Sequence, residues 1–140
     1  MLKLIRKATE KDIEQINILG EQLHHNFMKT YHIETEIDNK IAIVLVAEKS
    51  DIVGYLYAID LEDNIDLLSI FVDKNSRYQH IGTNLIEKLK SLSKDKTITL
   101  EVSSKNDAAI ALYKKNDFKE VGIRKNYYEN SDAIIMKWGN

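Results

Sequence analysis

The sequence has 140 residues with a formal net charge of −2, 44% hydrophobic residues, 30% charged residues and no cysteine. The length predicts one domain whose core needs no metal or disulfide. The balanced charge argues against a nucleic-acid-binding protein that works through a broad basic surface. Lack of cysteine excludes disulfides, zinc–thiolate sites and thiol nucleophiles. No stretch approaches the roughly 18 apolar residues of a membrane span, and no secretory segment opens the chain, so we expect a cytoplasmic protein.

The first half of the chain predicts three strands and two helices. Residues 2–7 alternate weakly and favour a short strand, whereas 12–23 carry apolar residues at helical spacing. Residues 24–38 are rich in histidine and aromatic residues and have no clear period, which favours a second short helix. Residues 41–47 form a continuous apolar run typical of a buried strand. A polar turn leads from it into a strand over 52–60, so these two strands form a hairpin.

The second half alternates strands with helices and closes with two strands. The strands are predicted over 65–72, 97–102, 118–124 and 133–138, and the helices over about 82–93 and 106–115. The complete order is β-α-α-β-β-β-α-β-α-β-β. This order predicts an α/β (α+β) protein with a mixed sheet and helices on both of its faces.

The turn over 77–83, between a predicted strand and a predicted helix, has the features of an anion site. Lys74, Arg77 and His80 bring positive charge, and the turn itself contains no acid. The start of a helix offers amide N–H groups that can bind phosphate. An ordinary solvated basic turn is the alternative. The lone Gly82 makes neither a dinucleotide fingerprint nor a P-loop.

Three polar side chains follow in the next strand and helix. Glu101 lies near the end of its strand, on the face opposite the apolar residues. Asn106 and Tyr113 are about two helical turns apart and project from nearly the same face. A carboxylate, an amide and a phenol can thus converge at the carboxyl ends of neighbouring strands, where open α/β sheets bind ligands. Taken singly, a solvated glutamate, a helix N-cap and a core tyrosine are the alternatives.

Several motifs, in order, resemble those of the GCN5-related N-acetyltransferase (GNAT) family. Arg77-Tyr-Gln-His-Ile-Gly82 is similar to the Gln/Arg-x-x-Gly-x-Gly/Ala signature of that family. Leu68-Ser-Ile-Phe-Val72 resembles the strand that the family lays along the pantetheine arm. The second cofactor-binding motif of the family resembles Thr99-Leu-Glu-Val102, Asn106–Tyr113 and Asn116-Asp-Phe118.

Within the family, Thr-Leu-Glu-Val, Ala-Ile-Ala-Leu-Tyr and Arg124–Tyr128 most resemble the RimI-like branch, the ribosomal-protein-alanine N-acetyltransferases. The resemblance covers residues 41–138 and implies a GNAT fold, a mostly antiparallel sheet of about seven strands, in a single N-acetyltransferase domain over 1–140. His80 departs from the signature, because it stands where the first glycine is expected. A histidine is tolerated there if its φ is negative, so we expect altered cofactor affinity rather than loss. Residues 24–38 lack the Phe-Pro-Trp-like segment of the branch, so its acceptor groove is not carried over.

The resemblance implies an acetyl-CoA-dependent N-acetyltransferase and gives roles to its residues. Glu101 is the implied base, and Tyr113 is the acid that protonates the departing coenzyme A thiolate. A backbone amide of the preceding strand polarises the thioester carbonyl. Asn106 binds the pantetheine arm, and the turn grips the pyrophosphate. The implied cofactor-binding residues are Ile70, Phe71, Val72, Arg77, Tyr78, Gln79, His80, Ile81, Gly82, Thr83 and Asn106.

The acceptor is predicted to be a primary amine, foremost the N-terminal α-amine of a protein or peptide. The candidate acceptor-binding residues are aromatic: Phe27, Tyr31, Tyr127 and Tyr128. A small amine (a polyamine, an aminoglycoside or an amino-acid derivative) is the alternative acceptor, and a non-catalytic acyl-CoA sensor is a third hypothesis. We expect no metal, because His24 and His25 would point about 100° apart on a helix and no nearby Cys or Asp completes a set. We expect no nucleic-acid or membrane partner, and either a monomer or a homodimer through an edge strand.

Overall fold

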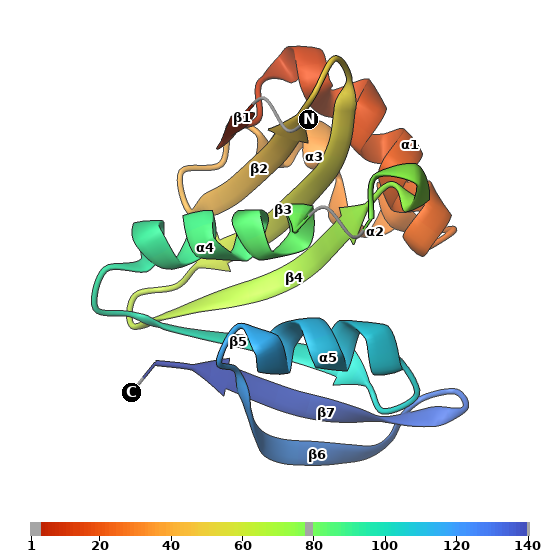
Figure 1. Ribbon diagram of the computed structural model, residues 1–140, viewed down its shortest axis with the longest axis vertical. Helices are drawn as coiled ribbons and strands as arrows, with labels where there is room; N and C mark the ends of the chain where they lie inside the picture. Colours follow the sequence, from red (N-terminus) through yellow and green to blue (C-terminus); the bar gives the residue numbers. More distant parts are fainter. Residues whose placement is uncertain (1–3, 78–79, 140) are drawn as a thin grey trace.

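A seven-stranded sheet with the order β1-β2-β3-β4-β5-β7-β6 organises the protein (Figure 1). The computed structural model describes residues 4–77 and 80–139. The strands are β1 (Leu4–Lys7), β2 (Ala42–Glu48), β3 (Ile52–Asp60), β4 (Asn64–Val72), β5 (Thr97–Ser103), β6 (Lys119–Tyr128) and β7 (Ser131–Trp138). Neighbouring strands run antiparallel, except that β4 and β5 are parallel. The predicted mixed, mostly antiparallel sheet is confirmed.

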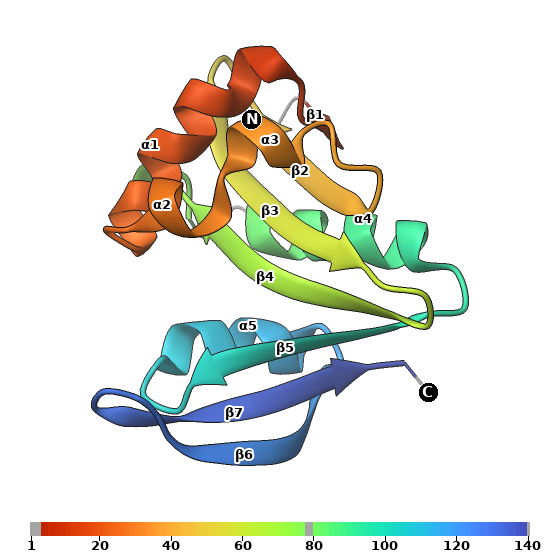
Figure 2. The same ribbon diagram turned by 180° about the vertical axis from the view of Figure 1, so that it is seen from behind.

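Helices cover both faces of this sheet, as predicted (Figures 1 and 2). The helices are α1 (Ile13–Leu23), α2 (Phe27–Tyr31), α3 (Ile33–Glu36), α4 (Ile81–Ser93) and α5 (Asp107–Lys115), with short 3₁₀ turns η1 (Glu10–Asp12) and η2 (Lys74–Ser76). α4 and α5 lie on one face, and α1, α2 and α3 lie on the other. None of the helices in the described residues is long and apolar enough to cross a membrane.

Each face of the sheet carries its own apolar core. In β2, Leu45 and Ala47 belong to the core under α4, whereas Val44 and Val46 belong to the core under α1. The apolar run over 41–47 is therefore continuous because both faces of β2 are buried. The fully buried members of the α4 core include Leu56, Ile65, Leu85, Ile86, Leu89 and Ile98, and those of the α1 core include Ile16, Phe27, Ile33 and Tyr55.

Residues 24–38 form two short helices, α2 and α3, rather than the single helix predicted. His32 separates them, because its φ of 50° lies in the left-handed region and ends α2. Phe27 and Ile33 are fully buried and anchor one helix each. The apolar residues of this segment thus mark two separate contacts with the core, which helical periodicity does not reveal.

The closing hairpin is longer than predicted, since β6 extends to Tyr128 and β7 begins at Ser131. The pairing register shifts between Arg124 and Tyr128, and Asn126 within this stretch has a φ of 54°. The Asn126 N–H donates to Asp132 Oδ1 at 2.8 Å. Apolar and polar residues do not alternate along a bulged, polar strand end. The predicted strand therefore ended too early.

β4 and β5 pair over only three residues, from Asn64 opposite Thr97 to Asp66 opposite Thr99. β4 continues to Val72 and β5 continues to Ser103, so both strands extend well past their last paired residues. The two strands diverge from there, and the sheet is open between them at their carboxyl ends (Figure 2). A ligand site is expected at this position in an open α/β sheet.

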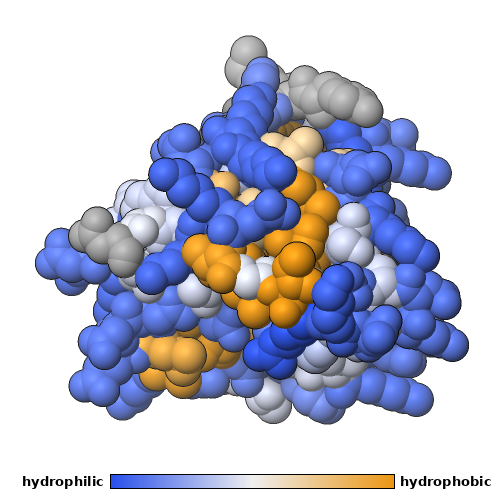
Figure 3. Space-filling model, turned by 90° about the horizontal axis from the view of Figure 1, so that it is seen from below, coloured by the Kyte–Doolittle hydropathy of each residue, from blue (hydrophilic) through white to orange (hydrophobic). Residues whose placement is uncertain are grey.

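The edge strand β6 carries an apolar patch. Figure 3 shows the molecule from below, with hydrophobic side chains surrounded by hydrophilic ones. β6 is the lowest strand in Figure 1, and its Val121 and Ile123 are each 58% exposed. The side chain of Ile123 lies opposite Ile134 of β7, which is half-buried.

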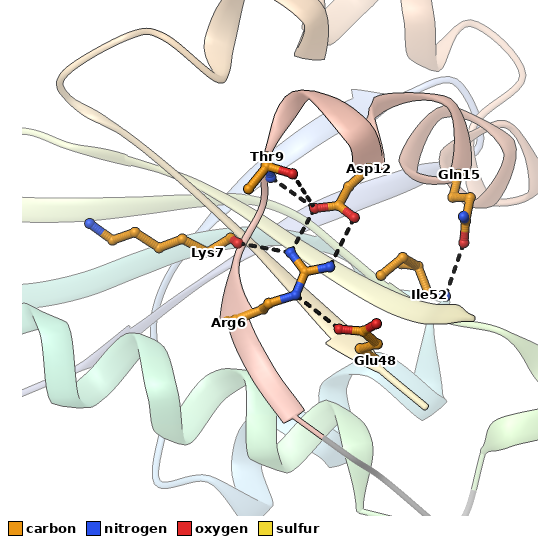
Figure 4. Close-up of polar contacts among 7 residues, drawn as sticks. All are labelled: Arg6, Lys7, Thr9, Asp12, Gln15, Glu48 and Ile52. Atoms are coloured by element: carbon orange, nitrogen blue, oxygen red, sulfur yellow. Dashed lines mark hydrogen bonds and ion pairs between the residues drawn. The ribbon is translucent and has the colours of Figure 1, made fainter. Parts of the chain in front are cut away.

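Arg6 joins β1, η1 and β2 (Figure 4). Its guanidinium donates to the two carboxylate oxygens of Asp12 at 2.7 and 3.0 Å, and to Glu48 Oε1 at 3.0 Å. Asp12 is 5% exposed and also accepts from the Thr9 N–H at 2.8 Å. The hydrogen bonds from Arg6 hold the pKa of Asp12 below its ordinary value of 3.8. This cluster fixes the start of α1 against the sheet.

We expect Asp12→Asn to lower the free energy of unfolding by about 1–3 kcal/mol, because the amide cannot form the charge-assisted pair with Arg6. The pKa of Asp12 is lowered in the folded state, so its contribution is present above the ordinary pKa and is lost as the pH falls through the folded pKa. Urea unfolding should show the gap between wild type and variant narrowing below about pH 4.

Glu48→Gln is the matched control, because it weakens a single contact to the same guanidinium. At neutral pH, Glu48→Gln should lower the free energy of unfolding by less than Asp12→Asn does. A stability gap for Asp12→Asn that stays constant from neutral to strongly acid solution would contradict this interpretation.

Candidate active site

A cavity of about 780 Å³ opens where β4 and β5 separate. The ends of both strands, the start of α4, one face of α5 and residues from the α1–α2 region and β6 line it. It brings together most of the residues singled out in the sequence: Tyr31, Ile70, Phe71, Val72, Arg77, His80, Ile81, Gly82, Thr83, Glu101, Asn106, Tyr113 and Tyr128. Tyr78 and Gln79 lie outside the described residues. Phe27 and Tyr127 are not among the lining residues.

β4 enters the cavity through a bulge. Its register with β3 shifts between Tyr57 and Ala58, so Leu68 lies between residues paired with them. The next residues, Ile70–Val72, line the cavity beyond the last pair with β5. β3 occupies one edge of this segment, so alternate backbone amides face the gap. Such amides can donate to an oxygen that gains negative charge.

The start of α4 closes one end of the cavity. Arg77 Nε donates to the Val72 carbonyl at 3.1 Å, and its guanidinium lies 5.2 Å from the centroid of the Phe71 ring. A Cβ at Gly82 would lie 3.3 Å from Leu112 Cδ2, so glycine lets α4 pack closely against α5. The first turn of α4 has no acid. Its amides and the nearby guanidinium therefore suit a phosphate group.

His80 occupies the N-cap position of α4 with a φ of 61° and a ψ of 19°. This corrects the expectation of a negative φ at this position. The left-handed conformation explains why glycine is expected here, since a side chain adds strain that glycine avoids. Histidine is one of the residues enriched among non-glycine residues with positive φ. The chain therefore accepts a strained backbone and an imidazole at the cavity wall.

Glu101 lies on the face of β5 that was predicted for it. Ile98 and Leu100 are buried in the α4 core, whereas Glu101 points to the opposite face and lines the cavity. Its Oε1 lies 3.1 Å from Nη2 of Arg124, which comes from β6. Tyr128 of β6 also lines the cavity, and burial together with the charge of Glu101 raises the pKa of Tyr128. Glu101 therefore stands between a cation and a phenol that keeps its proton.

α5 contributes an amide and a phenol. Asn106 Oδ1 accepts from the Ala109 N–H at 3.1 Å, so the N-cap role considered for Asn106 is confirmed, and Asn106 also lines the cavity. Tyr113 is only 7% exposed, and its ring packs 5.8 Å from that of Phe118. Burial raises the pKa of Tyr113 above its ordinary value. The Tyr113 hydroxyl therefore holds its proton at neutral pH and can donate a hydrogen bond.

Tyr31, the last residue of α2, forms another part of the cavity wall. Its hydroxyl donates to the Leu68 carbonyl at 3.4 Å, and burial raises its pKa. The structure corrects the prediction for Phe27, which has no exposed surface and so cannot contact an acceptor. The Phe27 ring lies 5.2 Å from that of Tyr31 and supports it from the core. Tyr127 is 54% exposed, with its ring 5.1 Å from that of Tyr128.

Sequence reasoning did not assign several lining residues to the site: Leu23, Leu68, Ser69, Ser103, Leu112 and Lys115. Leu68 had a signal, because the adjacent pair Leu67-Leu68 breaks the alternation of β4 at the bulge. Leu23 had none, since it approaches the cavity only through the packing of α1. The contact between Arg124 and Glu101 joins residues far apart in the sequence and had no local signal either.

The histidines near α2 do not form a metal site. Among residues 4–77 and 80–139, no group of three or more His, Cys, Asp or Glu side chains could hold a metal ion. His24 Nδ1 accepts from the Asn26 N–H at 3.1 Å, and the rings of His24 and His25 lie 6.4 Å apart. His24 thus has a local partner within its own turn.

The match to a family defines the class of protein. The acetyltransferase (GNAT) domain family matches residues 6–138, which is nearly the whole chain. This protein therefore belongs to the GNAT acetyltransferase family. The splayed β4 and β5 and the cavity between them are the parts of the fold at which the sequence motifs meet.

Individual relatives narrow the comparison. A Bacillus subtilis (strain 168) protein, provisionally named a [ribosomal protein bS18]-alanine N-acetyltransferase, is 35% identical over 139 residues, covering 94% of this chain and 92% of that protein. The crystal structure of the ribosomal-protein-S18-alanine N-acetyltransferase from Escherichia coli superimposes with a TM-score of 0.86 at 27% identity, covering 98% and 92% of the two chains. The PaiA N-acetyltransferase of Thermoplasma acidophilum, solved in complex with coenzyme A, shares the fold (TM-score 0.82, 21% identity, 100% and 99% covered).

We expect His80→Val to lower the free energy of unfolding by about 1–2 kcal/mol, because a β-branched residue is a severe outlier at positive φ. His80→Asn is the matched control, since asparagine tolerates this conformation, and it should stay within about 0.5 kcal/mol of wild type. Urea unfolding of the three proteins measures both values. Equal stability of the valine and asparagine variants would show that position 80 is not held in the left-handed region.

Proposed function

We propose that this protein is a single-domain N-acetyltransferase that transfers acetyl from acetyl-CoA directly to the N-terminal α-amine of a protein or peptide. One observation carries the proposal: a single cavity joins the anion-binding start of α4 to Glu101 and Tyr113 at the gap between β4 and β5. A phosphorylated cofactor that extends from α4 into this gap would bring its thioester between the carboxylate and the phenol.

The cofactor would be held mostly by backbone groups. The amides at the start of α4, with Arg77 and His80 beside them, would bind the pyrophosphate. Asn106 lies at the start of α5 and would hydrogen-bond the pantetheine arm. An amide of Ile70–Val72 would polarise the thioester carbonyl as negative charge develops on its oxygen. Coenzyme A bound to a protein of the same fold supports this choice of cofactor.

The acceptor amine has to lose a proton before it attacks the thioester. An α-amine has a pKa of about 7.7–8.0, so a large share is protonated at neutral pH. Glu101 would take this proton, through a water molecule. Attack forms the new C–N bond, and collapse of the intermediate breaks the C–S bond. Tyr113 would then protonate the departing thiolate, since burial keeps its hydroxyl protonated until then.

The charges of the cavity favour a peptide N-terminus over a polyamine. Glu101 is the one carboxylate among the described lining residues, and Arg124 already lies 3.1 Å from it. Arg77 and Lys115 make other parts of the wall positive. A polyamine carries several ammonium groups and would need several carboxylates. A peptide brings one amine followed by neutral backbone groups, which suit the hydroxyls of Tyr31 and Tyr128.

Mass spectrometry of reaction products tests the proposal. The protein is incubated with acetyl-CoA and a panel that contains the N-terminal peptide of ribosomal protein S18, other peptides, spermidine and an aminoglycoside. Acetylation of a peptide α-amine is the expected result, and the similarity to S18-specific relatives makes that peptide the first candidate. Turnover with the small amines alone would favour the alternative acceptor class. Binding of acetyl-CoA with no turnover on any acceptor would favour the acyl-CoA sensor.

The cellular setting and assembly belong to the same proposal. We infer a cytoplasmic enzyme, because its proposed acceptor and cofactor are cytoplasmic molecules. It would act as a monomer or as a homodimer through the open edge of β6, whose Val121 and Ile123 are exposed. No nucleic-acid or membrane partner is proposed.

We expect Tyr113→Phe to lower kcat by about tenfold or more while leaving the KM for acetyl-CoA nearly unchanged, because only the proton donor is lost. Steady-state kinetics with the best acceptor of the panel measure both values. Tyr57→Phe is the control, since Tyr57 is also a buried tyrosine but does not line the cavity, and its hydroxyl donates to Glu36 Oε2 at 2.8 Å. A kcat for Tyr113→Phe within about twofold of wild type would remove Tyr113 as the acid.

We expect Glu101→Gln to lower kcat/KM by about 10²–10⁴-fold and to flatten the acidic limb of its pH profile, because glutamine cannot accept the proton. Glu120→Gln, an exposed carboxylate on β6, should leave both the rate and the profile as in wild type. An unchanged acidic limb in Glu101→Gln would exclude this residue as the base.

A further inference from the structure

Arg124 forms a contact to the proposed base that the mechanism above does not use. Its Nη2 lies 3.1 Å from Glu101 Oε1, and the two side chains are 56% and 29% exposed. The contact engages one carboxylate oxygen, which leaves Oε2 to accept a hydrogen bond from the amine or its water. A carboxylate held at one oxygen has a defined orientation toward its substrate.

The sheet brings these residues together across an intervening strand. Glu101 of β5 pairs with Ile135 of β7, and Arg124 of β6 pairs with Ala133 of β7. Ile135 and Ala133 are two residues apart, so all four side chains lie on one face of the sheet. Arg124 therefore reaches over β7 to the cavity side of β5.

The end of β6 restrains Arg124 from its other side. The Arg124 guanidinium lies 5.4 Å from the centroid of the Tyr127 ring, a distance typical of a cation–π contact. Tyr127 follows the bulge at Asn126, whose N–H is held by Asp132 at 2.8 Å. The aromatic contact and the ion pair together favour one position of the guanidinium.

We propose that Arg124 is a positioning residue for acetyl transfer, whose guanidinium holds Glu101 Oε1 so that Oε2 faces the acceptor amine. This inference rests on the proposed function, because it assigns to Arg124 a role in the reaction at the same site. The acceptor amine approaches a carboxylate that is already oriented, so less of the reaction barrier comes from ordering the base.

The alternative is an ordinary surface ion pair that contributes little to stability. Activity readouts distinguish the two, because a surface pair does not alter catalysis. The other titratable groups lining the cavity around Glu101 do not change in the test: His24, Tyr31, Arg77, His80, Tyr113, Lys115 and Tyr128.

The first test compares Arg124→Ala, Arg124→Lys and Lys125→Ala. Lys125 is the matched control, since it is the neighbouring cation but pairs with Asp132 at 3.5 Å instead. We expect Arg124→Ala to lower kcat by about tenfold with an unchanged KM for acetyl-CoA. Arg124→Lys should recover part of the loss, and Lys125→Ala should match wild type.

The second test combines Arg124→Ala with Glu101→Gln. If Arg124 acts through Glu101, its removal costs no further activity once the carboxylate is gone, and the two losses are not additive. Additive losses would overturn the inference, because Arg124 would then act on another group. A kcat of Arg124→Ala within about twofold of wild type would overturn it as well.

Two measurements keep these outcomes interpretable. Circular dichroism melting of each variant identifies any loss of fold, and Arg124→Lys carries the first test if the alanine variant unfolds. Wild-type turnover is measured before the variants. An inactive wild type would refute the proposed function, whereas an active wild type with indifferent Arg124 variants would refute only the positioning role.

Discussion

The short parallel contact between β4 and β5 is the constraint on which the rest of the structure depends. Three residue pairs join these strands, and both strands then continue apart. A continuous sheet would satisfy its backbone groups internally, whereas an interrupted sheet leaves donors beside a cavity. Leu68, at the bulge of β4, and Gly82, where α4 packs closely against α5, both line the cavity at this gap. The site thus lies at an interruption of the sheet, between strands that the α4 core and the α1 core keep in place.

Burial sets the chemistry of this cavity as much as charge does. Tyr31, Tyr113 and Tyr128 all have raised pKa values, with burial as the first cause, so each can donate a hydrogen bond at neutral pH. The carboxylate Glu101 stands among them and is paired with Arg124 from two strands away. Proton donors and a carboxylate therefore share one cavity, which suits a reaction that removes one proton and returns another.

Local patterns predicted most elements because their apolar residues repeat with the period of a strand or a helix. The run over 41–47 predicted a buried strand, which the structure buries on both faces, and Glu101 was placed on the correct face of β5 by alternation alone. The prediction was wrong for two segments for the same reason, because each contains a residue whose backbone lies in the left-handed region. His32 splits residues 24–38 into two helices, and Asn126 lies in the bulged end of β6. A backbone of positive φ at a residue other than glycine leaves no period to detect.

By itself the sequence determined the order of the strands, the two apolar faces of the sheet and which residues gather at the start of α4 and on α5. These properties depend on neighbours within a few positions along the chain. Only the tertiary structure decided that Phe27 supports the cavity from the core, that His80 adopts a left-handed conformation and that Arg124 reaches Glu101. Each of these depends on how distant segments pack, since a bulge, a strained turn or a contact across a third strand has no signature in local composition.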